Sequence, residues 1–313
     1  MNSKKALIVT INNKHNVKSG LSNRVEDIAN FLERIGFEVE IVSNLRESSL
    51  DYYALICISS FTNVFENRSA RNKCDFLWFD AMDSWRLTRK SLYLDNPAKE
   101  SLKVARELFG RLFVRLADVV TYCSERDAKE DNIDLGNVII FGPSKVSPLK
   151  LKEHSRRFVF VGPSSYYPNR QAVNYLYSLA RSGIFKEVNL HIFGDSLEYR
   201  ESHPDVMKHG LSSDEMIYGK SDIHLVPIWE GAGIKYKALN PLSLGIQVIA
   251  SLEGSNGIVS HSKLHSCYTK RDFTERVMSA TWSEAEGYSN LNLIELDQRE
   301  LLQKYILESL KNL

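Results

Sequence analysis

The chain has 313 residues, of which 43% are hydrophobic and 25% are charged, and these proportions exclude a disordered or collagen-like protein. Its 40 basic and 39 acidic residues give a formal net charge of +1, which excludes a global attraction to nucleic acid. At roughly 150 residues per domain, the length predicts two domains, each large enough to bury its own core.

The amino-terminal segment and the cysteines indicate a cytoplasmic protein. Ala6–Val9 is too short for the core of a signal peptide, and no stretch of about 18 apolar residues predicts a membrane span. No two of the four cysteines form a CxxC pair, and Cys57 and Cys123 lie in strand-like apolar runs, so we expect these two to be reduced, buried thiols. Peripheral association with a membrane stays open.

The first forty residues predict one β-α-β unit. Ala6–Val9 and Val39–Val42 are short apolar runs, as expected for strands that are covered on both faces. Between them, apolar residues recur every three or four positions from Val25 to Leu32, which predicts a helix. Gly36 follows as a helix-ending glycine. Two strands joined by a helix form a parallel pair with a right-handed crossover.

The remainder of the first half continues this alternation. Strands are predicted over 54–59, 76–80, 117–123 and 138–141. A long helix is predicted over Pro97–Leu116, because Leu102, Phe109 and Leu112 share one face with other apolar residues. Its lysines and arginines form either a solvated polar face or a patch that contacts a membrane surface, and the sequence leaves both open.

A change in composition separates the two halves. Gly142–Arg157 combines prolines and basic residues with few apolar ones, which is typical of an interdomain linker. After it, strands are predicted over 158–161, 188–193, 223–227 and 248–251, and helices over 169–179, 233–244 and 296–313. We therefore expect an α/β protein with one Rossmann-like domain over 1–145 and a second over 146–290. A final helix within 291–313 is expected to pack back toward the first domain.

The loop that follows the predicted strand 223–227 is the most informative segment for chemistry. It contains Gly231 and Gly233, which let a backbone approach a ligand, and it leads into a helix whose first turns hold Lys235 and Lys237. Lysine at a helix N-terminus opposes the helix dipole, a placement that makes sense if a diphosphate binds there. The alternative is an ordinary strand–helix turn with exposed lysines. No GxGxxG or Walker motif occurs.

Two carboxylates follow the predicted strand 76–80. Asp80 and Asp83 form an Asp-x-x-Asp pattern that could hold a metal ion, act in acid–base chemistry, or cap the following turn. The eight histidines show no spacing typical of metal ligands. We expect no metal site, and the choice between a functional Asp83 and a capping role stays open.

The segment Pro227–Ser251 resembles the donor-binding signature of GT-B glycosyltransferases, in particular the family-4-like enzymes, also called glycosyl transferases group 1. It reads Gly231-Ala232-Gly233-Ile234-Lys235-Tyr236-Lys237 and then Leu244-Gly245-Ile246-Gln247-Val248-Ile249-Ala250-Ser251. Phe158–Asn169, Ile223–Pro227 and Ala117–Ser124 fall in the order that the family shows. The resemblance implies two Rossmann-like domains that face each other across a cleft, with the donor bound mainly by the second.

The resemblance also implies roles for individual residues. Lys235 would bind the donor diphosphate and offset charge on the leaving nucleotide, and Glu230 would stand near the sugar. Asp83 would contact the acceptor or act as a base. Residues implied to line the donor site are Gly20, Gly162, His209, Gly210, Leu211, Gly231, Ala232, Gly233, Ile234 and Asn240.

Two residues depart from the family pattern. Asn240 occupies the position where relatives usually carry a glutamate that binds the ribose hydroxyls. Asparagine can still bond a hydroxyl, but without the strength of a charged acceptor. Pro241 follows and lacks a backbone N–H, so we expect the helix to kink or restart there.

The resemblance implies a metal-independent hexosyltransferase that retains anomeric configuration and needs no cofactor beyond its donor, expected to be a UDP-sugar. The acceptor would be a glycan or a lipid-linked glycan in surface polysaccharide or glycoconjugate synthesis, with no nucleic acid partner. Two alternatives stay open: a non-catalytic GT-B-like partner or sugar-binding subunit, and a nucleotide-sugar epimerase on the same fold. The sequence leaves the oligomeric state open.

Overall fold

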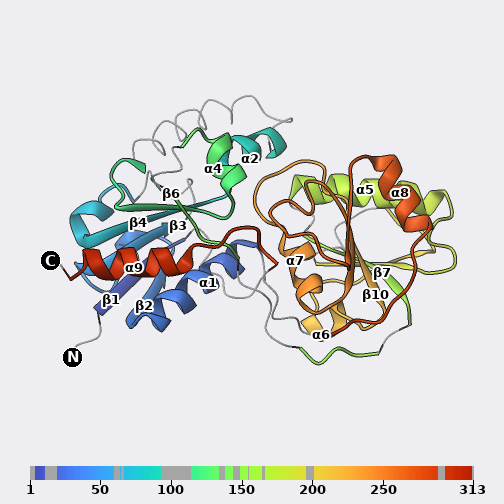
Figure 1. Ribbon diagram of the computed structural model, residues 1–313, viewed down its shortest axis with the longest axis horizontal. Helices are drawn as coiled ribbons and strands as arrows, with labels where there is room; N and C mark the ends of the chain where they lie inside the picture. Colours follow the sequence, from blue (N-terminus) through green and yellow to red (C-terminus); the bar gives the residue numbers. More distant parts are fainter. Residues whose placement is uncertain are drawn as a thin grey trace. The chain divides into compact units, whose positions relative to one another are not determined.

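The structure, a computed structural model, describes most of the chain. The described residues are 4–10, 20–59, 64, 67–92, 114–133, 138–143, 149–153, 155–163, 166–194, 201–287 and 293–311. The chain divides into two compact units, the first from Met1–Pro143 with Leu296–Leu313 and the second from Ser144–Glu295 (Figure 1). These divisions lie close to the predicted boundaries at 145 and 290. Most of the helix predicted over Pro97–Leu116 lies outside the described residues.

The first unit contains a parallel six-stranded sheet in the order β2-β1-β3-β4-β5-β6. Its strands are β1 (Lys4–Val9), β2 (Phe37–Val42), β3 (Tyr53–Ser59), β4 (Cys74–Met82), β5 (Val119–Tyr122) and β6 (Val138–Ile140). Helix α1 (Gly20–Arg34) joins β1 to β2, so the predicted β-α-β unit is confirmed. Gly36 has a φ of +95° and ends this helix as predicted.

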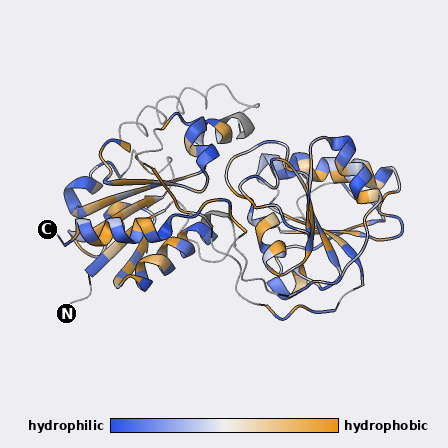
Figure 2. Ribbon diagram, in the orientation of Figure 1, coloured by the Kyte–Doolittle hydropathy of each residue, from blue (hydrophilic) through white to orange (hydrophobic). Residues whose placement is uncertain are grey.

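Helices cover both faces of this sheet. On one face, α1 and α9 (Arg299–Ser309) pack against Ile8, Leu55 and Trp78. On the other, α2 (Trp85–Leu92) and α4 (Glu125–Glu130) pack against Ile56 and Phe79. Because successive strand residues point to opposite faces, these buried strands are apolar on both sides (Figure 2). The linking segments include 3-10 turns η1 (Leu45–Glu47) and η3 (Ala70–Lys73).

The last helix of the chain lies in the first unit rather than the second. Leu302, Ile306 and Leu310 are buried in the same cluster as α1, which is the side that their spacing predicts. Just before α9, the Gln298 side chain accepts a hydrogen bond of 2.8 Å from the backbone N–H of Ile140 on β6.

The second unit also contains a parallel six-stranded sheet, in the order β12-β11-β10-β7-β8-β9. Its strands are β7 (Arg157–Val161), β8 (Leu190–Phe193), β9 (Val206–Lys208), β10 (Asp222–Val226), β11 (Gln247–Ser251) and β12 (Leu264–Cys267). Its helices are α5 (Tyr167–Arg181), α6 (Asp214–Ile217), α7 (Tyr236–Ser243) and α8 (Lys270–Met278). Counted from β7, this is the 3-2-1-4-5-6 order of nucleotide-binding Rossmann sheets. The predicted α/β fold with two Rossmann-like domains is confirmed.

Helix α7 does not restart at Asn240 and Pro241, although a restart is one of the two outcomes that the sequence predicted. One helix runs through Pro241, although proline removes a backbone donor. Packing offsets that loss, because Ala238, Leu239 and Leu242 are fully buried in the core of the unit. A short amphipathic helix gains most of its stability from such burial rather than from intrinsic propensity.

A buried ion pair connects α1 to the central sheet of the first unit. Arg24 donates from Nε and Nη2 to both carboxylate oxygens of Asp80 at 3.1 and 2.6 Å, and both side chains are almost inaccessible to water. Thr121 donates to the same carboxylate at 2.7 Å, and the Arg24 guanidinium lies over the ring of Phe141. The carboxylate is therefore fully engaged within the core.

We predict that Asp80→Ala lowers the free energy of unfolding by about 3 to 5 kcal/mol, because it leaves the Arg24 charge buried without its partner. Urea denaturation followed by circular dichroism measures this loss. The control is Lys129→Ala, which removes an exposed pair with Glu125 and should change stability by no more than about 0.5 kcal/mol. Equal effects of the two substitutions would contradict the assigned role of the Arg24–Asp80 pair.

Candidate functional site

The strand order of the second unit reverses between β7 and β10, which is where sheets of this kind bind ligands. Gly162 follows β7 at this edge. A Cβ atom there would lie 2.7 Å from the Asn169 amide nitrogen and 2.8 Å from Lys237 Nζ, so no larger residue fits without a shift. Gly194, which follows β8, has a φ of +115°, and its Cβ would lie 2.7 Å from the Gly162 carbonyl oxygen. Glycine is therefore required at Gly194, whereas at Gly162 a larger residue would displace the side chains of Asn169 and Lys237.

The turn after β10 also depends on glycine. Gly231 and Gly233 have φ values of +137° and +76°, a backbone region that other residues rarely adopt. The turn ends at Lys235, which is the N-cap residue of α7. The sequence prediction of a glycine-rich turn leading into a helix is confirmed at this position.

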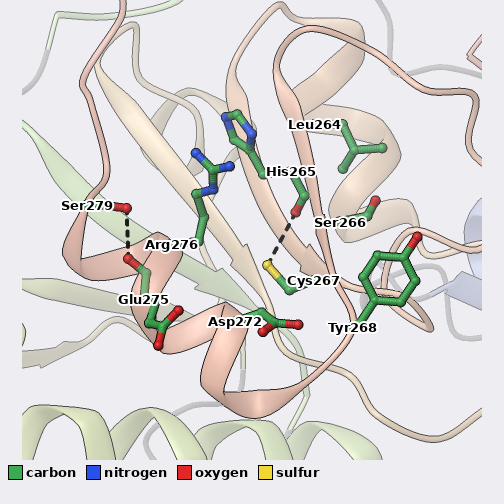
Figure 3. Close-up of a pocket in the computed structure, with 9 residues that line it drawn as sticks. All are labelled: Leu264, His265, Ser266, Cys267, Tyr268, Asp272, Glu275, Arg276 and Ser279. Carbon is green, nitrogen blue, oxygen red and sulfur yellow. Dashed lines mark hydrogen bonds between the residues drawn. The ribbon is translucent and has the colours of Figure 1, made fainter.

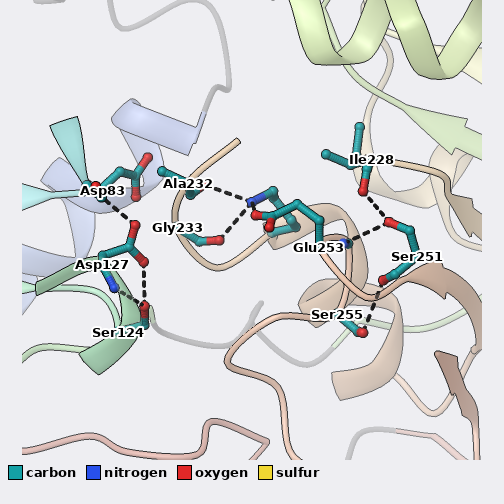
Figure 4. A network of polar contacts seen from close by, with 12 residues as sticks. Asp83, Ser124, Asp127, Ile228, Ala232, Gly233, Ser251, Glu253 and Ser255 are labelled. Atoms are coloured by element: carbon teal, nitrogen blue, oxygen red, sulfur yellow. Dashed lines mark hydrogen bonds and ion pairs between the residues drawn. The ribbon is translucent and has the colours of Figure 1, made fainter. Parts of the chain in front are cut away.

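Lys235 lies inside this turn rather than on its surface. Its ammonium group donates to the carbonyl oxygens of Ala232 and Gly233, both at 2.8 Å, and forms an ion pair of 3.1 Å with Glu253 (Figure 4). An ammonium has three N–H donors, and three protein acceptors lie within reach of this one. Lys235 therefore holds the turn in place, and a direct bond to phosphate would require it to exchange one of these partners.

Lys237 has different surroundings on the first turn of the same helix. Its ammonium donates to the side-chain oxygen of Asn169 and lies 4.9 Å from the ring centre of Phe160. Among the described residues, these contacts include no carboxylate. Burial, and then the charge of Lys235, lowers the pKa of Lys237 to about 7. An anion bound at this edge would offset the free energy that burying the Lys237 ammonium costs.

The other residues implied for the donor side differ in accessibility. Glu230 is exposed and Ala232 is buried. The Ile234 side chain is only 8% exposed and packs into the main apolar core, so only its backbone could face a ligand. The sequence placed both lysines of this turn near a diphosphate but gave an individual role only to Lys235, and it did not indicate Asn169 as the partner of Lys237. The only signal for this pairing was that each residue lies near one of the two loops.

His209 belongs to a stack of aromatic rings beside β8 and β9. Its ring lies parallel to those of His191 and Phe193, with centroid distances of 4.9 and 4.5 Å, and its Nε2 lies 2.9 Å from His191 Nδ1. Burial, and then the nearby charge of Arg157, lowers the pKa of His209 and favours its neutral form. Gly210 and Leu211 come next in the chain. The Gly210 carbonyl accepts a hydrogen bond from the Gly194 N–H, and Leu211 is 65% exposed. A base contact at this loop stays a prediction.

Asn240 lies in the middle of α7 with its amide turned toward Tyr218. Its Nδ2 atom is 3.4 Å from the Tyr218 hydroxyl, and its Oδ1 atom is buried without a hydrogen-bond partner in the described part of the chain. A buried acceptor without a donor is costly, and a ligand hydroxyl that reached it would satisfy it. Because this oxygen is inaccessible in the present conformation, the predicted ribose contact requires the Asn240 side chain to move, and it stays a prediction.

The two carboxylates of the first unit have separate roles. Asp80 is fully buried in the pair with Arg24, so it is not a metal ligand or an exposed cap. Asp83 is half-buried just after β4, and its Oδ1 atom accepts a hydrogen bond of 3.3 Å from the Cys123 thiol. Gly20, implied to close on the donor, is the first residue of α1, and residues 11–19 before it lie outside the described ranges.

A separate pocket of about 560 Å³ lies between β12 and α8 in the second unit (Figure 3). It is lined by Leu264, His265, Ser266, Cys267, Tyr268, Asp272, Glu275, Arg276 and Ser279. Charges of both signs line this pocket, so its chemistry favours no single class of ligand. In the described ranges, no cluster of three or more potential metal ligands occurs and no helix is long and apolar enough to cross a bilayer.

Comparison with solved structures identifies the fold as that of GT-B glycosyltransferases. The catalytic domain of starch synthase IV from Arabidopsis thaliana, bound to ADP and acarbose, matches 99% of both chains at 9% identity with a TM-score of 0.59. S. aureus MnaA with UDP matches 99% of this chain and 98% of its own at 10% identity, with a TM-score of 0.55. An E. coli trehalose-6-phosphate structure bound with UDP-2-fluoro glucose matches 98% and 95% at 8% identity, with a TM-score of 0.53.

Other comparisons set limits on this similarity. The chain matches the crystal structure of TarM over 82% of its own residues at 10% identity, with a TM-score of 0.47, but spans only 51% of that chain. No known family profile matches the sequence, and no curated protein matches it.

We predict that the two lysines of the glycine turn affect stability in opposite directions. Lys235→Met should lower the free energy of unfolding by about 3 kcal/mol, because it removes the ion pair with the poorly accessible Glu253 and the hydrogen bonds to the carbonyls of Ala232 and Gly233. Lys237→Met should raise the melting temperature of the ligand-free protein, because it removes a buried charge that has no carboxylate contact among the described residues.

The pH dependence follows from the direction of the Lys237 shift. Its pKa falls from 10.5 in the unfolded chain to about 7 in the folded one, so the unfolded state binds the proton more tightly. The cost to stability is complete below pH 7 and disappears as the pH rises toward 10.5. The gain from Lys237→Met should therefore shrink with rising pH in thermal melts, and a gain that is constant or grows would contradict this assignment.

Proposed function

We propose that this protein is a glycosyltransferase that moves a sugar from a nucleotide-sugar donor to a glycan or lipid-linked acceptor. The observation that carries the proposal is the desolvated Lys237 ammonium beside Gly162, at the point where the strand order of the second sheet reverses. A cation with little compensation, next to a glycine at a strand end of the sheet, suits a ligand that is both negatively charged and closely approached.

The donor diphosphate is the ligand that fits these features best. When the sugar leaves, negative charge grows on the nucleotide, and fixed cations in a site shielded from water stabilise it most. Lys237 would bond the phosphate directly, and Lys235 would contribute its charge while holding the glycine turn. The start of α7 adds the positive end of a helix dipole.

A nucleoside diphosphate sugar is favoured over a simple phosphate because the fold is shared with structures that hold nucleotides. The three solved structures described above contain ADP, UDP and UDP-2-fluoro glucose. Of these possible donors we propose a UDP-sugar. The orphaned Asn240 oxygen would accept from a ribose hydroxyl once its side chain moved, and the loop His209–Leu211 would contact the base.

The acceptor side is proposed for the first unit, with Asp83 as acceptor contact or base. We also propose transfer with retention of configuration, no requirement for a metal ion, and a role in surface polysaccharide or glycoconjugate synthesis. In that role the protein would work in the cytoplasm, at times in contact with the membrane that carries a lipid-linked acceptor.

We predict that UDP raises the melting temperature of the wild-type protein and that Lys237→Met weakens UDP binding at least about tenfold, since it removes one charge-assisted hydrogen bond. Calorimetry at pH 8 in two buffers of different ionisation enthalpy should show proton uptake, because Lys237 is largely neutral before binding and charged beside phosphate. Lys129→Met, on an exposed helix of the first unit, is the control. Unchanged affinity and no proton uptake would remove Lys237 from the phosphate site.

We predict that Asp83→Asn lowers the rate of sugar transfer by about 100-fold, as loss of a general base does, while donor affinity stays within about twofold. The matched control is Asp75→Asn at the opposite end of β4, where the carboxylate accepts a hydrogen bond from the Tyr52 hydroxyl. Transfer at the wild-type rate by Asp83→Asn would return this residue to a structural role.

Screening with several nucleotide sugars separates the alternatives. Binding without turnover or hydrolysis of any donor would favour the non-catalytic subunit. An epimerised nucleotide sugar formed with no acceptor present would favour the epimerase.

A further inference from the structure

We propose that Asp131, assisted by Asp127, is a positioning residue that fixes the orientation of Asp83 for the acceptor. The inference rests on the proposed function, and it concerns the Asp83 turn, which we define as Met82–Ser84 between β4 and α2. Neither Asp131 nor Asp127 carries any role in the reaction described above.

The Asp83 turn is held by hydrogen bonds to its backbone rather than by apolar contacts. Asp127 accepts from the N–H of Ser84 at 2.7 Å. Asp131 accepts from the N–H groups of Trp85 at 3.0 Å and Arg86 at 3.1 Å. The Ser84 hydroxyl donates to Asp131 at 2.7 Å and accepts from the next N–H, that of Leu87, at 3.2 Å.

This arrangement changes the interpretation of the sequence pattern. Four consecutive N–H groups at the start of α2 donate to Asp127, Asp131 and Ser84, so these residues do the capping that the sequence allowed for Asp80 or Asp83. These four hydrogen bonds do not involve the Asp83 carboxylate. It is half-buried, and the Cys123 thiol donates to one of its oxygens.

The backbone just before Asp83 adopts a conformation that needs such support. Met82 has a φ of +61°, in the left-handed region that side chains other than glycine rarely adopt. The pairing of β4 with β5 shifts register between Asp80 and Met82, and such an irregularity re-aims the side chains that follow. Local strain of this kind persists only where the surroundings over-determine the conformation, and it gathers at functional sites.

Asp131 caps α2 at a cost in free energy, because its carboxylate is buried away from water. It is 6% exposed, and its four hydrogen bonds come from Ser84, Trp85, Arg86 and the Tyr122 hydroxyl, all of them neutral groups. Burial raises the pKa of its carboxyl group against the lowering effect of these bonds. Serine or asparagine can cap a helix without burying a charge. A carboxylate is required where one group must accept from several donors at once and fix their positions together.

Asp127 completes the support from the start of α4. It is fully buried, and its carboxylate also accepts from the Ser124 hydroxyl, which caps α4 in return (Figure 4). Asp127 thus lies in the first turn of α4, and Asp131 is its C-cap residue. Helix α4 therefore holds both carboxylates in place, and they bind the backbone of Ser84, Trp85 and Arg86 at the Asp83 turn. A displacement of Asp83 by about 1 Å would be enough to cost a large part of the rate.

A double-mutant cycle tests the inference. Asp131→Asn keeps the shape of the side chain but removes the charge and one acceptor, and it should lower the rate of transfer about 10- to 100-fold with donor affinity unchanged. In Asp83→Asn/Asp131→Asn, the loss should be no greater than in Asp83→Asn alone, because Asp131 acts through Asp83. Independent, multiplied losses would overturn the inference.

Two further variants keep the test decisive if Asp131→Asn folds poorly. Tyr122→Phe removes one hydrogen bond to Asp131, so it should give a smaller loss of transfer that also vanishes in the Asp83→Asn background. The matched control is Asp272→Asn, which removes the same kind of carboxylate cap from exposed α8 in the second unit and should leave transfer unchanged. A wild-type transfer rate in Tyr122→Phe, or a loss in Asp272→Asn equal to that in Tyr122→Phe, would contradict positioning.

The outcomes separate this inference from the proposed function. If the wild-type protein neither transfers nor hydrolyses a sugar from any nucleotide donor, the proposed function fails and the positioning role fails with it. If the wild-type protein transfers sugar and Asp131→Asn matches its rate, only the positioning role fails. Faster amide exchange of Trp85 and Arg86 in Asp131→Asn would verify that the substitution had released the turn.

Discussion

Parallel hydrogen bonding within each sheet is the constraint on which the rest of this structure depends. It places the carboxyl ends of all strands in a sheet at one edge, so loops that are far apart in the sequence converge there. In the second unit, the reversal between β7 and β10 brings Gly162 next to Lys237, although they are separated by most of the domain. The strands themselves are apolar because both of their faces are buried. The polar groups that could bind a ligand therefore lie in the loops at this edge.

The second unit treats two neighbouring lysines in different ways. Lys235 is compensated by Glu253 and two carbonyls, so its charge stabilises the turn that contains it. Lys237 keeps a charge that the fold opposes, and burial lowers its pKa to about 7. Sites that bind charged ligands commonly sacrifice stability in this manner, because the ligand supplies the missing compensation. The difference between the two side chains is the basis for the ligand site proposed at this edge.

The first unit uses its charges mainly to fix the backbone. Arg24 and Asp80 neutralise each other inside the core, and Asp131 accepts hydrogen bonds from consecutive N–H groups at the start of α2. Such buried networks specify one conformation when every member is satisfied. Asp83 follows the Asp80 pair on the chain and directly precedes the capped start of α2, and its carboxylate accepts a hydrogen bond from the Cys123 thiol.

Apart from helices α2, α4, α6 and α8, which it did not predict, the sequence by itself determined the order of the helices and strands, the two Rossmann-like units and the glycine turn before α7. These features follow from the period of apolar residues and from glycine conformations, which are local properties. It missed β9, with three residues, and β12, whose residues are largely accessible, because neither has a buried apolar run. Pro241 predicted a kink or a restart in α7, and core packing keeps the helix continuous. Only the tertiary structure decided which charges are compensated, because the partners of Asp80 and Lys235 lie 56 and 18 residues away and no local pattern connects them.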